Sequence, residues 1–175
     1  MELKTKLRLF AALTCLAGSA AQAQFNNSSL SAGPLINTVI GQGAQYGLAL
    51  EFDRYLESGF EFVARAPAVI AELPAGADTP SGVGRVFGTG LSLGVRYLFL
   101  EEQFRPWAGA QLTWTILLTQ PSAVWGLGAG PSVGIDWVFH ESFALSLRGS
   151  YDVFVELNRP WRHQLSVTLG LVILL

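Results

Sequence analysis

The chain has 175 residues, of which 50% are hydrophobic and only 14% are charged. Past residue 23 it carries eight arginines, no lysine and twelve acidic residues, a balance that argues against a nucleic-acid partner. The one cysteine, Cys15, precedes residue 23, so no disulfide supports the rest of the chain. After residue 23 there is no run of about 18 apolar residues, which excludes helical membrane spans but leaves membrane β-barrels open.

Residues 1–23 are predicted to be a secretory signal peptide, which we exclude from the fold. Lys4, Lys6 and Arg8 form a positive start, residues 9–16 form a short apolar core, and Ala21-Gln22-Ala23 is a small-x-small cleavage site. Two alternatives remain open, an uncleaved membrane helix and a lipoprotein signal that uses Cys15. Residues 24–175 are then a single exported domain.

Eight segments of this domain alternate apolar residues with small or polar ones, which is the period of a β-strand with two different faces. They are residues 28–37, 45–55, 58–69, 84–100, 106–118, 124–139, 143–157 and 162–175. The first is weakly patterned because Gly33-Pro34 interrupts it. The connections at 57–59, 101–105 and 140–142 are tight and the others are looser. Outer-membrane barrels show this alternation of short periplasmic turns and longer outer loops.

The two faces of these strands are inverted relative to a soluble protein. In strand 124–139, large apolar residues such as Trp125, Leu127 and Ile135 share one face, while Gly128 and Asp136 share the other. The same parity places Arg54, at a strand end, as the one charge on the apolar face. The sequence therefore predicts an all-β fold, a closed eight-stranded antiparallel transmembrane β-barrel in the outer membrane with both termini periplasmic. A soluble β-sandwich that buries these apolar residues is the alternative.

The polar face would place many charged side chains inside the barrel. An eight-stranded barrel is just wide enough to be filled by side chains, so we expect these groups to pair across the lumen and close it. Because acidic residues outnumber arginines in the set, a narrow path that prefers cations is a second interpretation. The predicted lumen charge network consists of Glu51, Asp53, Glu61, Arg65, Arg96, Asp136, Arg148, Asp152 and Glu156.

Aromatic residues flank the predicted turns and the opposite rim. Amphipathic rings prefer the headgroup level of a bilayer, so two aromatic girdles are expected of a barrel. The girdle residues we predict are Tyr97, Phe99, Trp107, Trp125, Trp137, Phe139 and Phe143. Near the outer rim, Arg85, Arg159 and Arg162 are candidates for contact with lipopolysaccharide phosphates, since arginine suits bidentate phosphate binding. Solvated loop charges are the alternative.

Three stretches carry a resemblance to a known family. Residues 105–110 (RPWAGA), 125–136 with its recurring glycines, and 143–151 (FALSLRGSY) resemble strands of OmpA-like outer-membrane β-barrel domains. The resemblance implies a small outer-membrane barrel. From the apolar outer face, the outer arginines and the expected scaffold function, we predict outer-membrane lipid and lipopolysaccharide as partners, together with an envelope protein. Two departures stand out. The chain ends on Leu175, whereas such barrels finish on an aromatic residue, and the family's peptidoglycan-binding domain is absent, so tethering to the cell wall is not implied.

A catalytic function has weak support in the sequence. His140-Glu141-Ser142 is the one cluster with hydrolase-like residue types, and small lipid A deacylase barrels use a His-x-Ser pair. Here the cluster falls in a tight turn on the periplasmic side, which gives the serine no positioned acid or oxyanion donors. Two histidines and a cysteine-free barrel argue against a metal site, and no cofactor is expected. We therefore expect a structural or interaction protein, with a narrow channel as the alternative and a lipid A-modifying enzyme as a weaker one.

Overall fold

The computed structural model describes residues 28–40, 43–56, 58–72, 85–118, 123–156 and 161–175. The predicted signal peptide, residues 1–23, and most of the longest predicted loop lie outside these ranges. So do Arg159 and the side chains of Arg85 and Glu156. All structural statements below concern the described residues.

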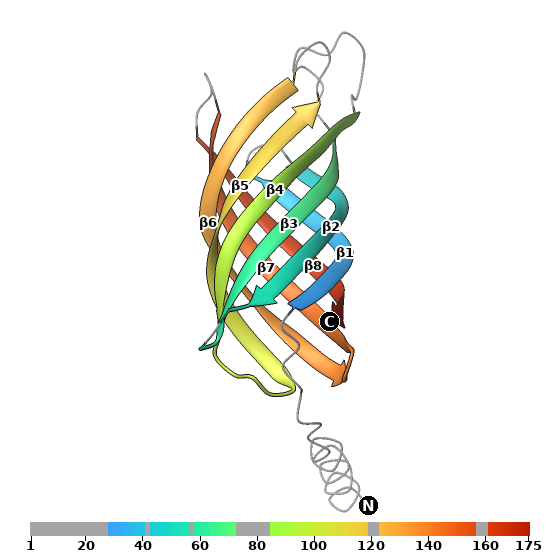
Figure 1. The fold of residues 1–175 in the computed structure, drawn as a ribbon. Helices are drawn as coiled ribbons and strands as arrows, with labels where there is room; N and C mark the ends of the chain where they lie inside the picture. The colour runs from blue at the N-terminus through green and yellow to red at the C-terminus, as the bar shows by residue number, and fades with distance from the viewer. Residues whose placement is uncertain (1–27, 41–42, 57, 73–84, 119–122, 157–160) are drawn as a thin grey trace, which may run out of the picture.

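Eight strands form one closed antiparallel barrel (Figure 1). Each strand pairs with its neighbours in the chain, and the first also pairs with the last, so the sheet has no free edge. The strands are β1 (Ser28–Val39), β2 (Gly43–Tyr55), β3 (Phe60–Glu72), β4 (Arg85–Leu98), β5 (Phe104–Leu118), β6 (Ala123–His140), β7 (Phe143–Glu156) and β8 (Arg162–Leu174).

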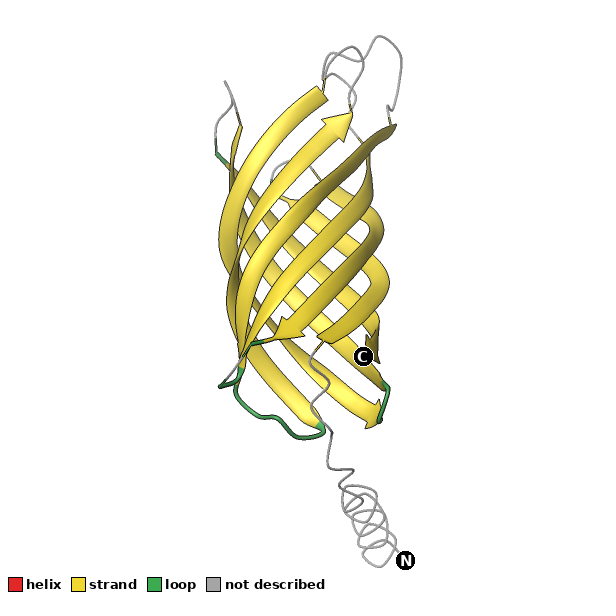
Figure 2. Cartoon of the chain, in the orientation of Figure 1, coloured by secondary structure: helices red, strands yellow, loops and turns green. Residues whose placement is uncertain are grey.

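The predicted closed eight-stranded barrel is confirmed, and the predicted strand ends differ from the observed ones by three residues or fewer. Strands joined by loops make up the whole of the described chain (Figure 2). Over the described ranges, no helix is long and apolar enough to cross a bilayer.

The three predicted tight turns lie at one end of the barrel, where β1 begins and the chain ends (Figure 1). Between β2 and β3, Ser58 and Gly59 both take positive φ, at 54° and 84°, a conformation typical of tight hairpin turns. The Gly59 N–H donates to the Tyr55 hydroxyl at 3.0 Å. At the same end the Leu175 N–H donates to the Ser28 carbonyl at 2.9 Å, which seals the junction of β1 and β8. We refer to this end as the turn end and to the opposite end as the loop end.

Proline interrupts the wall at three places, one of which is Pro67, where the β3–β4 pairing skips Ala66 and Pro67. The β1–β8 pairing skips Gly33 and Pro34, and the β6–β7 pairing skips Gly130 and Pro131. Proline has no N–H to give to the sheet, so each lost rung is local to the proline. Glycine lets the backbones approach there, because a Cβ at Gly130 would lie 1.7 Å from the Tyr151 carbonyl oxygen. This explains why the first strand is weakly patterned and yet continues to Val39.

Side chains alternate between the outer surface and the interior along each strand. The outer surface is lined by large apolar residues, whereas the buried positions are mostly polar or charged. Apolar burial is limited to small groups, of which Leu35, Ala49 and Val69 form one. The predicted inversion of faces is therefore present, and an apolar exterior of this kind is stable in lipid and not in water.

Candidate functional site

The interior of the barrel is the candidate functional site. Seven of the nine predicted network residues have buried or half-buried side chains that contact one another across the lumen. Asp152 is also buried there, but its partners are neutral side chains. The side chain of Glu156 is not among those that the structure describes. Because the strands tilt around a narrow barrel, the described network residues from five different strands meet in the lumen. The contacts fall into two groups, one around Glu51 and one around Arg96.

Glu51 on β2 is shared by three arginines from other strands. It accepts a hydrogen bond from Arg148 on β7, directly across the lumen. Its carboxylate oxygens also lie 3.7 Å from Nε of Arg65 and 3.6 Å from Nη1 of Arg96. Arg65 in turn donates to the Thr168 hydroxyl on β8. One carboxylate therefore links four strands, and through Arg65 a fifth.

Arg96 on β4 is the second centre, and four carboxylates surround its guanidinium. Besides Glu51, these are Asp53 at 3.5 Å, Asp136 at 3.3 Å, and Glu61, which bonds to Nε. The Arg96 residue is only 5% exposed. The same Asp53 oxygen, Oδ2, also accepts a hydrogen bond from Ser29 at 3.0 Å. Buried charges are stable only when they are paired in this way.

Trp107 lies inside the lumen, and its predicted place in the aromatic girdle is wrong. The residue is 2% exposed, with the guanidinium carbons of Arg96 and Arg148 at 4.9 Å and 5.3 Å from its ring centre. Its indole N–H points to Asp136 at 3.4 Å. Room for the ring comes from Gly134 on the neighbouring strand, where an added Cβ would lie 2.4 Å from the indole. Trp107 therefore fills the lumen between the two arginines.

Asp152 on β7 is held by neutral side chains. Gln111 Nε2 donates to both of its carboxylate oxygens, at 3.0 and 2.8 Å, and the Thr113 hydroxyl lies 3.4 Å away. The Gln111 carbonyl oxygen accepts from Arg148, which joins this group to the Glu51 centre. A continuous chain of hydrogen bonds, which we call the mid-height closure, therefore crosses the lumen from β5 to β7 to β2.

Two cavities flank this closure. The larger cavity has a volume of about 40 Å³, measured as the space open to the centres of water molecules. It extends toward the loop end of the barrel, where Val39, Leu117 and Arg162 line it. The smaller provides about 10 Å³ beside Glu51, Arg148 and Ser146. Nearer the turn end, Val138, Ala144 and Val172 form an apolar cluster. The described lumen thus contains polar space both beside Gln111 and Asp152 and beside Glu51 and Arg148.

Three lumen residues on β5 were missed from the sequence: Arg105, Trp107 and Gln111. They share one parity with Thr113, opposite the outward series Phe104, Pro106, Ala108, Ala110 and Leu112. Arg105 donates to the Glu102 carbonyl at 3.1 Å, at the turn end of the lumen. Applying the alternation rule to this strand would have found all three. With Arg105 added, the acidic surplus on which the cation path depended is smaller.

The predicted outer arginines are only partly described. The Arg162 side chain lines the larger cavity, which places it on the lumen side of the wall and not on the lipid side. Its parity matches that of the buried Ser166 and Thr168, which explains this orientation. Direct contact of Arg162 with lipid phosphates is therefore not supported. The outward neighbour is His163, whose Nδ1 lies 2.6 Å from the Tyr151 hydroxyl.

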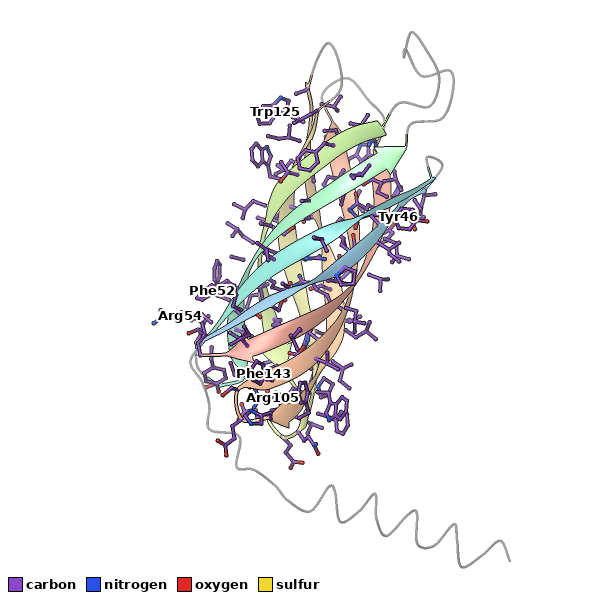
Figure 3. The ribbon with its side chains drawn as sticks, turned by 90° about the vertical axis from the view of Figure 1, so that its right-hand side faces the viewer. Tyr46, Phe52, Arg54, Arg105, Trp125 and Phe143 are labelled. Carbon is purple, nitrogen blue, oxygen red and sulfur yellow. The ribbon has the colours of Figure 1, made fainter. Side chains whose placement is uncertain are left out.

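The remaining six predicted girdle residues lie on the outer surface, all at least 38% exposed. At the turn end, Tyr97 contacts Phe99 with ring centres 5.5 Å apart, and Trp137 contacts Phe139 at 5.9 Å. At the loop end, Trp125 packs against Trp114 at 5.1 Å. Figure 3 shows Trp125 near one end of the barrel and Arg54 and Phe143 near the other, all pointing outward. Two aromatic belts therefore bound the apolar surface.

The His140-Glu141-Ser142 cluster is exposed at a turn, as expected. The Ser142 backbone N–H donates to His140 Nδ1 at 3.2 Å, so this nitrogen serves the turn and does not bind the serine hydroxyl. Within the described ranges, no group of three histidine, cysteine or acidic side chains could hold a metal ion. In this turn, the serine hydroxyl is therefore not held against a base.

Comparisons with known proteins agree with this architecture. No protein-family model matches the chain, and the search of curated proteins finds no match. Among solved structures, Neisserial surface protein A (NspA) matches with a TM-score of 0.61 and 14% identity, over 85% of this chain and 97% of that one. The outer membrane protein OprG from Pseudomonas aeruginosa matches with a TM-score of 0.56 and 11% identity, over 84% and 95%.

The N-terminal β-barrel domain of Pseudomonas aeruginosa OprF is also similar, with a TM-score of 0.51 and 17% identity, over 85% of this chain and 99% of that domain. Identities this low show a shared fold, and the fold is the one that the resemblance to OmpA-like domains implied. The chain therefore has the fold of the small eight-stranded outer-membrane β-barrels.

Proposed function

We propose that this protein is a structural or interaction component of the outer membrane whose lumen is plugged. The barrel sits in the membrane with its turn end toward the periplasm, and its surfaces meet lipid, lipopolysaccharide and another envelope protein. The apolar outer surface between two aromatic belts supports the membrane location. The short turns gathered at one end, beside the first strand and the C-terminus, support the orientation.

The main support for a plugged lumen is the network of ion pairs that crosses the interior of the barrel. Arg96, Arg148 and Trp107 occupy the centre, and their partners come from strands on all sides. A solute crossing the barrel has to displace side chains that are buried, ion-paired and hydrogen-bonded to one another. Removing a partner from such a pair leaves a buried charge and costs about 3–5 kcal/mol, so spontaneous opening is rare.

An interaction function also fits the chemistry of the described residues. The histidine, glutamate and serine of the 140–142 turn are not arranged as a catalytic group. The exposed surface is instead apolar and aromatic along the wall, with Glu101, Glu102 and Glu141 exposed at the turn end. Such a surface suits contact with lipid along the wall and with a periplasmic or membrane partner at the rim.

Planar-bilayer conductance of the purified barrel tests the proposal. Insertion is first verified by heat-modifiable gel migration and by recovery in the outer-membrane fraction of cells. We expect inserted protein to produce no steady conductance. Steady openings in the picosiemens to nanosiemens range would contradict the plugged lumen and favour the narrow channel. A change in lipid A mass on overexpression, abolished by Ser142→Ala, would instead support an enzyme.

A further inference from the structure

The larger lumen cavity lies between the mid-height closure and the loop end of the barrel. Its walls come from seven strands, and it reaches Val39 on β1, Leu117 on β5 and Arg162 on β8 at the strand ends. Its inner end is formed by Gln111, Thr113 and Asp152, the hydrogen-bonded group described above. We name this space the outer vestibule. Gln111, Thr113 and Asp152 form its floor.

The size of the outer vestibule limits what can occupy it. Its 40 Å³ of space for water centres corresponds to about three water molecules, since one ordered water needs about 10–15 Å³ of such space. A molecule that replaces these waters has about four to six non-hydrogen atoms. The smaller cavity beyond the floor, at about 10 Å³, has no room for such a molecule.

The lining of the outer vestibule favours a neutral occupant. Three charged groups line it, and none is free: Asp152 is bonded to Gln111 and Thr113, Arg65 to Glu51 and Thr168, and Arg162 at the loop end also has a partner. An incoming ion would therefore add an unpaired charge to a buried site, which is costly.

The uncharged part of the lining is both polar and apolar. Carboxamides and hydroxyls are supplied by Asn37, Gln45, Thr115, Gln164 and Ser166, and apolar contacts come from Leu35, Val69 and Phe154. Asn37 is 5% exposed, and its Oδ1 is buried with no hydrogen-bond partner among the described residues. A buried acceptor of this kind favours an occupant that brings an N–H or O–H donor.

We infer that the outer vestibule is a binding site for a small neutral molecule with N–H or O–H donors, about the size of acetamide. The molecule enters from the loop end, donates a hydrogen bond to Asn37 and stops at the floor formed by Gln111 and Asp152. This site goes beyond the proposed structural function, because it gives the plugged barrel a ligand of its own.

Single cysteines provide the test, because the barrel itself contains none. Ser166→Cys places a thiol in the outer vestibule, and Ser146→Cys places one in the smaller cavity beyond the floor. Both serines are buried and inward-facing on neighbouring strands, which makes them a matched pair. The probe is iodoacetamide, a small neutral carboxamide, applied to the folded, membrane-inserted full barrel, with each rate divided by that of the unfolded variant.

We expect Ser166→Cys to react at least about tenfold faster than Ser146→Cys, whose thiol is reached only through rare opening events. The rate at Ser166→Cys should level off as iodoacetamide increases, and acetamide should slow it by competition. In the Asn37→Leu background, the acetamide concentration needed for half-protection should rise about fivefold, the value of one lost hydrogen bond. Thr38→Val, a change at the outward-facing residue next to Asn37, should leave this half-protection concentration of acetamide unchanged.

Two results would overturn the inference. A Ser166→Cys rate that rises linearly without competition by acetamide means that the cavity holds water only. A Ser166→Cys rate as low as that of Ser146→Cys means that the vestibule is not accessible. Equal and fast labelling of both cysteines would instead show an open lumen, and the plugged lumen of the proposed function would fail with it. The two failures are therefore distinguishable.

Discussion

Replacement of Arg96 by methionine tests the charge network most directly. Methionine keeps the unbranched stem and most of the volume, so the main change is loss of the guanidinium. That group lies 3.6 Å from Glu51, 3.5 Å from Asp53 and 3.3 Å from Asp136, and it also bonds to Glu61. The variant therefore leaves four carboxylates in the lumen without their shared cation.

The magnitude follows from the burial of these groups. Removing one partner of a buried ion pair costs about 3–5 kcal/mol, and loss of the cation–π contact with Trp107 lies within that range. With a urea dependence of about 2 kcal/mol per molar, a loss of about 4 kcal/mol moves the unfolding midpoint by about 2 M. Arg54→Met is the control. Arg54 is exposed at the turn end of β2, so this change should stay within about 0.5 kcal/mol.

The assay is urea unfolding of barrels inserted in lipid vesicles, followed by tryptophan fluorescence and by heat-modifiable gel migration. A rescue variant separates electrostatics from packing: Asp53→Asn and Asp136→Asn, added to Arg96→Met, should recover about half of the lost stability by removing two unpaired charges. Our reasoning is refuted if Arg96→Met loses less than about 1 kcal/mol. It is equally refuted if the two asparagines recover nothing.

Two further predictions concern the packing of the lumen and the lipid-facing wall. Gly134→Ala should destabilise the barrel by about 1–3 kcal/mol, because the added carbon would lie 2.4 Å from the Trp107 ring. Gly149→Ala is the matched control, since nothing lies within 4 Å of the carbon added there. Equal stabilities of the two variants in urea would contradict the observed packing of Trp107. Leu48→Arg, halfway along β2 on the outer surface, should cost about 2–4 kcal/mol in lipid vesicles. Leu48→Ala, which adds no charge, controls for lost lipid contact, and an arginine no more costly than alanine would argue against a lipid-facing wall.

The strands and their faces were predictable because a two-residue period is a local property. Large apolar residues such as Trp125 and Leu147 alternate with small or charged ones, and the backbone of a strand must send them to opposite faces. The strand ends were less well defined. Gly33-Pro34 weakened the pattern of the first strand, although the β2 partner keeps that strand regular on its other side.

The contents of the lumen were only partly predictable. Trp107 was assigned to the girdle from its residue type, since tryptophan is common at membrane interfaces. Its inward position depends on parity and on Gly134 of the next strand, which lies opposite it in the register. Arg162 was assigned to lipid contact from its residue type as well, since arginine suits phosphate binding. Its position in the alternation of β8 instead directs its side chain toward the outer vestibule.

The sequence by itself determined the number of strands, the apolar exterior and the polar interior, because each follows from alternation along single strands. Only the tertiary structure decided which charges meet. Glu51 and Arg148 are 97 residues apart and touch because closure and tilt of the barrel bring β2 and β7 across the lumen. The same closure leaves the outer vestibule empty of side chains, a property of the packed interior that no single strand encodes.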